Sequence, residues 1–157
     1  MNTLIVYYSY GGNTRQIAER LQKQLGADVL ELRTAVPYPA DYDAVVDQGQ
    51  AEVDRGFLPE LLPLDRDPAD YDAILLGTPV WWYTCAPAVS AFLHAHSLAG
   101  KTVCPFMTNG GWVGHTEKDL AAACAGAVMK KGLDVKFDDH TLKTPADAIR
   151  RWAEQLG

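Results

Sequence analysis

Short apolar runs alternate with segments of helical periodicity along most of this sequence. The apolar runs predict strands that are buried on both faces, as in a parallel sheet covered by helices. Parallel neighbours need crossover connections, which the helical segments can supply on both faces of the sheet. The alternation therefore predicts an α/β fold, a three-layer sandwich. The length of 157 residues suits a single domain over residues 1–157.

The hydrophobic pattern divides the chain into expected strands and helices. The strands are expected over residues 4–8, 28–33, 71–77, 102–107 and 133–141. The helices are expected over residues 15–25, 42–53, 87–94, 116–131 and 145–156. Residues 36–70 are the hardest to interpret, because prolines interrupt the pattern both before and after the helix expected at 42–53. Residues 57–64 are compatible with a strand, a loop or a lid.

Composition narrows the class of protein. Hydrophobic residues make up 48% and charged residues 22%, which is ordinary for a globular domain. No apolar run reaches the roughly 20 residues of a membrane span, and the first residues lack the pattern of a signal peptide. Cys85, Cys104 and Cys124 form neither a disulfide framework nor a zinc motif. We expect a cytoplasmic protein in a reducing compartment, without a membrane partner.

The net charge of -6 is concentrated in one part of the chain. Residues 41–72 hold ten acidic and two basic side chains, so the rest of the chain is slightly basic. A protein that binds nucleic acid would show a basic stripe instead, and no nucleic-acid partner is expected. The acidic segment could attract a basic partner protein, or it could simply keep the surface hydrated.

A short polar loop follows the first apolar run and precedes the first helical segment. Its residues are Ser9, Tyr10, Gly11, Gly12, Asn13 and Thr14. A helix N-terminus presents unpaired N–H groups and a partial positive charge, so such a loop can bind a phosphate. It lacks the Gly-Lys-Ser/Thr ending of a nucleoside-triphosphate loop and the third glycine of a dinucleotide site. An ordinary strand–turn–helix connection is the alternative interpretation.

Two further segments of unusual composition follow predicted strands, at residues 78–85 and 108–114. The carboxyl ends of parallel strands meet at one edge of the sheet, where such folds bind their ligands. The first polar loop and these two segments are therefore expected to lie close together. Their coincidence strengthens the prediction of a phosphate site.

The same three segments resemble the motifs of single-domain flavodoxins. They are Tyr8-Ser9-Tyr10-Gly11-Gly12-Asn13-Thr14, Gly77-Thr78-Pro79-Val80-Trp81-Trp82 and Thr108-Asn109-Gly110-Gly111. The resemblance implies a five-stranded parallel sheet of order 2-1-3-4-5 with flavin mononucleotide (FMN) as cofactor. Gly11 departs from the family pattern, which usually has Thr there, so one hydroxyl donor to the phosphate is lost and a neighbouring hydroxyl or a water must replace it.

The resemblance also implies roles for individual residues. The phosphate would be held by Ser9, Gly12, Asn13 and Thr14, with the amide of Tyr10. The flavin ring would be flanked by Thr78, Pro79, Val80, Trp81, Trp82 and Tyr83, with Trp82 as the first choice for stacking. After Thr108, the backbone N–H groups of Asn109, Gly110 and Gly111 would reach the pyrimidine edge of the ring.

Two functions are compatible with such a site. The first is a low-potential carrier, a monomer that passes single electrons between redox partner proteins and needs no catalytic acid or base. The alternative is an FMN-dependent reductase of quinones or other small acceptors that uses NAD(P)H. Cys85 has no histidine placed to activate it, so a small buried residue is the better interpretation. No metal site is expected from the four histidines.

Overall fold

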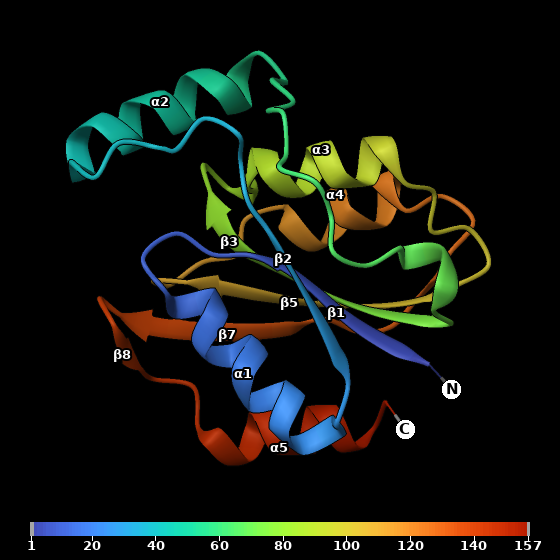
Figure 1. Cartoon of the computed structure of the whole chain (residues 1–157). Helices are drawn as coiled ribbons and strands as arrows, with labels where there is room; N and C mark the ends of the chain where they lie inside the picture. The colour runs from blue at the N-terminus through green and yellow to red at the C-terminus, as the bar shows by residue number, and fades with distance from the viewer. Residues whose placement is uncertain (1, 157) are drawn as a thin grey trace.

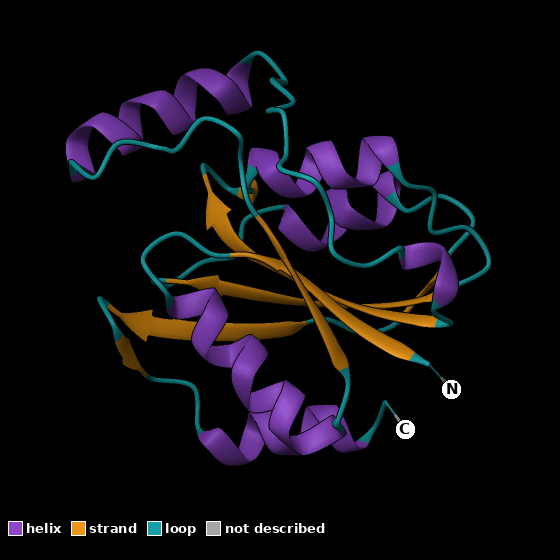
Figure 2. Ribbon diagram, in the orientation of Figure 1, coloured by secondary structure: helices purple, strands orange, loops and turns teal. Residues whose placement is uncertain are grey.

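A computed structural model describes residues 2–156 and shows a twisted sheet between two helical layers (Figures 1 and 2). The helices are α1 (Asn13–Leu25), α2 (Tyr42–Asp54), α3 (Pro87–Ala95), α4 (Thr116–Ala123) and α5 (Ala146–Glu154). The longer strands are β1 (Thr3–Tyr8), β2 (Asp28–Leu32), β3 (Ala73–Trp81), β5 (Thr102–Asn109) and β7 (Leu133–Asp138). The two-residue strands are β4 (Thr84–Cys85), β6 (Val128–Met129) and β8 (Thr141–Leu142).

The five longer strands are parallel and lie in the order β2-β1-β3-β5-β7, which confirms the expected α/β sandwich and its strand order. The short strands add to this sheet: β4 and β8 form antiparallel hairpins with β3 and β7, and β6 pairs with the start of β5. In Figure 1, α1 and α5 cover one face, α3 and α4 cover the other, and α2 lies beyond α3.

Alternate residues of each strand enter two separate cores, because successive side chains of a strand point to opposite faces. In β1, Leu4 and Val6 join the core beneath α3 and α4, whereas Ile5 packs beneath α1 and α5. Gly77 of β3 permits a close approach of Phe106, since a Cβ at Gly77 would lie 2.3 Å from Phe106 Cζ. Both faces of the central strands are therefore sealed, and only their ends can form a site.

The predicted helix over residues 116–131 is wrong in its second half. The helix ends at Ala123, and Gly126 has a φ of +86°, a conformation that an α-helix does not contain. Val128 and Met129 then pair with Thr102 and Val103 as β6. The apolar residues Val128 and Met129 therefore form part of the sheet and not of a longer helix.

Two predicted strand boundaries also need correction. The third strand was expected over 71–77 with a loop after it, but β3 runs from Ala73 to Trp81 and turns back into β4. The fifth was expected to continue through residue 141, but β7 ends at Asp138, and Asp139, with a φ of +52°, opens a turn into β8. Both differences place hairpin turns at the carboxyl edge of the sheet.

The segment between β2 and β3 is mostly irregular. The predicted helix at 42–53 is confirmed as α2, whose N-terminus is capped by the Asp41 carboxylate accepting from Ala44 N at 2.9 Å. Residues 57–64 form no continuous strand, although Leu61 makes an isolated bridge to Thr34. Among residues 2–156, no helix is long and apolar enough to cross a membrane.

Candidate functional site

A cavity of about 750 Å³ opens at the carboxyl edge of the sheet, where the sequence predicted a ligand site. It is lined by Tyr10, Gly11, Asn13, Tyr38, Ala40, Tyr42, Pro79, Thr108, Asn109, Gly110, Phe137, Asp139 and His140. The lining combines members of all three predicted segments with parts of two others, residues 38–42 and 137–140. Its size falls within the range of cofactor sites.

The loop after β1 turns sharply through two glycines. Gly11 and Gly12 have φ values of +81° and +98°, which side chains other than glycine rarely adopt. Gly12 is the N-cap of α1 and leaves open space around it, since a Cβ there would meet no atom within 4 Å. The loop thus exposes the N-terminus of α1 at one end of the cavity.

Three side chains of this loop are engaged within the protein. Ser9 Oγ accepts a hydrogen bond from Arg15 N at 3.1 Å, and the buried Thr14 Oγ1 lies 2.7 Å from Thr108 Oγ1. Asn13 Nδ2 donates to the carbonyl of Asp139 at 2.8 Å. Within residues 2–156 no backbone acceptor and no side-chain cap takes the N–H groups of Asn13 and Thr14. These N–H groups, more than the hydroxyls, are available to an anion.

Thr78 and Pro79 form the end of β3 that faces the site. Thr78 is fully buried, and its Oγ1 accepts a hydrogen bond from Ala86 N at 3.0 Å and donates to Pro79 O at 2.8 Å. Pro79 lines the cavity, whereas Thr78 lies behind it and fixes the β3–β4 hairpin. Pro79 therefore forms part of the cavity wall, and Thr78 supports that wall from behind.

The three consecutive aromatic residues after Val80 point to three different places. Trp81 packs edge-on among tyrosines, with its ring centre 5.0 Å from that of Tyr38. Trp82 Nε1 donates to Val46 O of α2 at 3.0 Å, and Trp82 lines a smaller cavity. Tyr83 is half exposed, with its ring centre 5.0 Å from that of Trp112. None of the three lines the larger cavity.

The smaller cavity, of about 420 Å³, lies between α2 and the β3–β4 hairpin. Its lining is Tyr10, Tyr42, Val45, Val46, Gly49, Val80, Trp81 and Trp82. Tyr10 and Tyr42 belong to both cavities, so the two spaces adjoin. Gly49 lets α2 come close to the hairpin, because a Cβ there would lie 3.3 Å from Trp81 Cε3.

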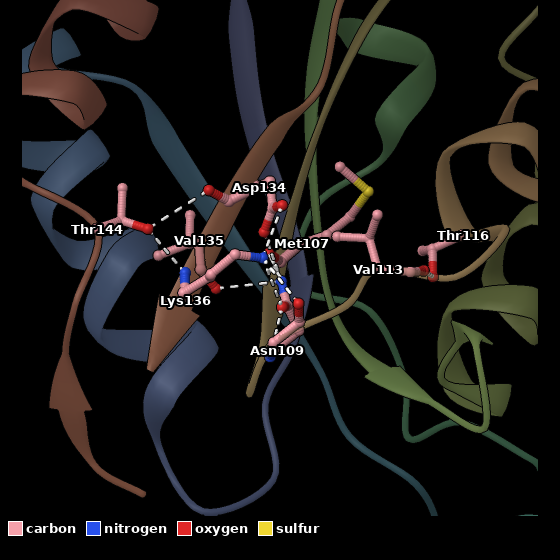
Figure 3. Close-up of polar contacts among 9 residues, drawn as sticks. Met107, Asn109, Val113, Thr116, Asp134, Val135, Lys136 and Thr144 are labelled. Carbon is pink, nitrogen blue, oxygen red and sulfur yellow. Dashed lines mark hydrogen bonds and ion pairs between the residues drawn. The ribbon is translucent and has the colours of Figure 1, made fainter. Parts of the chain in front are cut away.

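The loop after β5 is held in place by a polar network that Figure 3 shows. Asn109 Oδ1 accepts from Gly111 N at 3.0 Å, and Asn109 Nδ2 donates to Asp134 Oδ1 at 2.7 Å. Lys136 Nζ donates to Gly111 O at 3.2 Å and to Asp134 Oδ2 at 3.1 Å. The N–H of Gly111 is thus occupied within the loop, while Gly110 lines the cavity.

A buried carboxylate supports the wall formed by residues 38–42. Glu52 of α2 accepts hydrogen bonds from the Tyr38 hydroxyl at 2.6 Å and from Gln48 Nε2 at 2.8 Å. Tyr10 donates its hydroxyl to Pro39 O at 2.5 Å. Burial, reinforced by the Glu52 carboxylate, raises the pKa of Tyr38, so this hydroxyl stays protonated and keeps its role as a donor.

Sequence reasoning missed six residues of the lining: Tyr38, Ala40, Tyr42, Phe137, Asp139 and His140. The first three lie in the segment that prolines made difficult to interpret. The last two form the β7–β8 turn, which was expected to be strand. The polar run Asp138-Asp139-His140 inside an apolar strand pattern was the available signal for that turn.

The sequence matches the family model described as "Flavodoxin" over residues 2–156. The chain belongs to the flavodoxin family. No curated protein matches it significantly. The resemblance that the three loop segments indicated is therefore confirmed over nearly the whole length of this flavodoxin-family chain.

Several solved structures are similar to it. A candidate flavoprotein from Bacteroides eggerthii is 27% identical, with 99% of this chain and 97% of that chain covered and a TM-score of 0.81. A candidate flavoprotein from Bacteroides uniformis is 25% identical, with coverage of 98% and 97% and a TM-score of 0.82. A flavoprotein from Lactobacillus acidophilus, solved in complex with FMN, is 25% identical, with coverage of 85% and 91% and a TM-score of 0.71.

Proposed function

We propose that this chain binds FMN in the larger cavity and passes single electrons between redox partner proteins. FMN as the cofactor is supported by membership of the flavodoxin family and by the similar protein that was solved with FMN. The observation that carries the proposal is the cavity itself, which joins the open N-terminus of α1 to the ends of β3 and β5. Its volume and its mixed lining suit a flat ring that carries a phosphorylated chain.

Different residues of the cavity would bind different parts of FMN. At one end, the N–H groups of Asn13 and Thr14 and the positive end of the α1 dipole would bind the phosphate. At the other end, Pro79 and the Asn109–Gly110 backbone would contact the ring. Bound FMN supplies the redox chemistry, and the protein positions it and tunes its surroundings.

Hydrogen bonds connect the loops of this site and restrain them. The Thr14–Thr108 pair joins the phosphate loop to the end of β5, and Lys136 holds the loop that follows. A site that changes little during reaction favours electron transfer, because no acid or base has to move toward a substrate.

The acidic segment provides a surface for partners. Nine of its ten carboxylates are exposed, and the tenth is Glu52. Four of the exposed ones, Asp41, Asp43, Asp47 and Asp54, lie on or beside α2, whose first residue Tyr42 lines the cavity. A basic face on a redox partner would be attracted to this region, and added salt would slow the association. We propose a monomer that acts in this way in the cytoplasm, where its three buried free cysteines would stay reduced.

Stepwise anaerobic reduction of the FMN-loaded protein tests the carrier function. A carrier should take up its two electrons in two separated one-electron steps, visible in the absorption spectrum and as a radical signal. Uptake of both electrons together, without a radical signal, would contradict it.

One observation favours the reductase alternative. The smaller cavity is apolar and aromatic, adjoins the proposed FMN site through Tyr10 and Tyr42, and has room for a small flat acceptor. A reductase would oxidise NADPH in the presence of a quinone without any partner protein. The purified carrier should show no such turnover.

A further inference from the structure

We infer that His140 binds the phosphate of FMN as a cationic donor and makes FMN affinity depend on pH. This inference rests on the proposed FMN site. His140 lies in the β7–β8 turn, far in sequence from the phosphate loop, yet the two touch at one end of the cavity. A Cβ built on Gly11 would find His140 Cε1 at 3.6 Å as its nearest neighbour.

Two hydrogen bonds hold the imidazole in this place. Asn13 Nδ2 donates to Asp139 O at 2.8 Å, which leaves Asn13 Oδ1 as an acceptor. His140 Nδ1 lies 3.1 Å from that oxygen and therefore donates to it. The other ring nitrogen, Nε2, makes no hydrogen bond to any group within residues 2–156, although it lies 3.7 Å from Asp139 Oδ1. Asn13 thus orients the ring and leaves Nε2 for a ligand.

The position of His140 explains how the site tolerates glycine at residue 11. A side chain there would point at the imidazole, and the hydroxyl that the family usually has at this position is absent. When the ring is protonated, His140 Nε2 is a donor from a different element that can serve the same phosphate. A protonated imidazole adds a charge-assisted hydrogen bond, which a hydroxyl cannot.

Few other ionisable groups face the imidazole. From its own turn comes Asp139, which is exposed and whose Oδ1 lies 3.7 Å from His140 Nε2. From the neighbouring segments come only tyrosines among the described residues of the cavity lining, namely Tyr10, Tyr38 and Tyr42. The guanidinium of Arg15, on the first turn of α1, is paired with Glu31 instead. His140 is therefore the one side chain of the described lining that can carry a positive charge.

The test measures the dissociation constants of FMN and of riboflavin, which lacks the phosphate, by quenching of flavin fluorescence. The variant is His140→Asn, whose amide can keep the donor to Asn13 but removes Nε2 and the charge. The control is His94→Asn, at an exposed position of α3 outside both cavities. Thermal unfolding of each apo-protein verifies that the substitutions leave the fold intact.

Imidazole changes its charge between about pH 5 and 8. At pH 6 the variant should bind FMN roughly three- to tenfold more weakly than the unchanged protein, whereas riboflavin binding should be the same. At pH 8.5 the difference for FMN should shrink. The phosphate of FMN also ionises, with a pKa of about 6. Because this ionisation is common to both proteins, it cancels in the ratio of their dissociation constants at each pH.

Two results would overturn the inference while leaving the FMN site standing. One is equal FMN affinity of the variant and the unchanged protein at pH 6. The other is an equal loss of affinity for riboflavin and for FMN in the variant, which would show that His140 only supports the turn. If the unchanged protein binds neither flavin, the proposed function fails together with the inference.

Discussion

Thr14 joins two parts of the site through its hydroxyl. Its Oγ1 lies 2.7 Å from Thr108 Oγ1, and both residues are buried. The resemblance to flavodoxins implied that Thr14 helps to hold the phosphate. In the structure its hydroxyl connects the start of α1 to the end of β5, while the Thr14 N–H has no acceptor within residues 2–156.

A double-mutant cycle on this pair measures its contribution. Thr14→Val should lower the free energy of unfolding by about 1–3 kcal/mol, because the Thr108 hydroxyl loses its partner while it remains buried. Thr108→Val should have a similar effect, and the double variant should cost less than the sum of the two. Urea unfolding of the apo-proteins gives these values.

If the two losses of unfolding free energy were simply additive in the double variant, the two hydroxyls would not interact, contrary to this prediction. The same variants also test the hydroxyl as a phosphate ligand. Loss of affinity for FMN but not for riboflavin in Thr14→Val would show that the hydroxyl reaches the phosphate when the cofactor is bound.

Some residues of the site could be predicted from the sequence and others could not, for a physical reason. Gly11, Asn13, Pro79 and Gly110 lie at or shortly after the carboxyl ends of the strands expected from the sequence, so the parallel topology alone brings them to one edge. His140 enters the cavity only because the chain reverses at Asp139. That reversal depends on a left-handed residue inside a stretch with strand periodicity.

At the scale of elements, α2 depends on a few specific contacts. It packs on α3 and β3, and Glu52 ties it to Tyr38 in the preceding segment. Trp82 Nε1 adds a hydrogen bond to Val46 O. Because α2 lines the smaller cavity and carries Tyr42, which lines both cavities, loosening of α2 would alter one wall of the proposed site.

Glu52→Ala should loosen α2 while the sheet stays intact. Tyr38 and Gln48 would lose their buried acceptor, so amide hydrogen exchange in α2 should become at least about tenfold faster. Exchange in β1 and β5 should remain nearly unchanged. Glu52→Gln is the matched control, because its amide oxygen can still accept from Tyr38.

An equal acceleration in α2 and in the central strands would contradict this prediction, since it would mean that α2 opens only with the whole molecule. Exchange followed by mass spectrometry distinguishes the two cases.

The elements that the sequence predicted well share a strong pattern. The apolar run in β1 predicts a buried strand, and the spacing of Ile17, Ala18 and Leu21 predicts a helix with one apolar face. Both predictions hold because these side chains are buried in the two cores. The stretch after Ala123 kept an apolar pattern compatible with a helix. Gly126 was the weak local signal against a continuing helix, and the tertiary pairing of Val128 with Thr102 decided the structure.

At the scale of the whole molecule, burial of ionisable groups makes stability depend on pH. Burial raises the pKa of Cys104 to about 11 and that of Cys124 to about 11. Burial also raises the pKa of Tyr8 and of Tyr38 above the usual value for tyrosine. Each of these groups binds its proton more tightly in the folded than in the unfolded chain.

The free energy of unfolding should therefore fall as the pH rises through the alkaline range. Between about pH 9 and 11 the unfolded chain releases protons that the folded chain retains, so alkalinity favours unfolding. Urea unfolding at pH 8, 9.5 and 10.5 in the presence of a reductant measures the slope.

The variant Cys104→Ala/Cys124→Ala should show a shallower slope, with the remainder due to the tyrosines and to Cys85, whose pKa burial also raises. A flat profile in the unchanged protein, or an identical slope in the variant, would contradict the assignment of the effect to these thiols.

The overall charge distribution was the property of the whole molecule that sequence alone predicted most directly. Exposure of nine carboxylates in residues 41–72 follows from their charge, because an unpaired carboxylate is costly to bury. Burial of Glu52 was not predictable, since it depends on Tyr38 and Gln48 meeting it inside the fold.

The central claim is that FMN occupies the cavity at the carboxyl edge of the sheet. The most direct test is a titration of the isotope-labelled apo-protein with FMN, followed by amide chemical shifts. The account predicts saturation at one FMN per chain, with the largest changes at residues 10–14, 108–110 and 139–140. No saturable change, or changes centred on the cavity at the opposite edge near Gly26 and Tyr71, would contradict it.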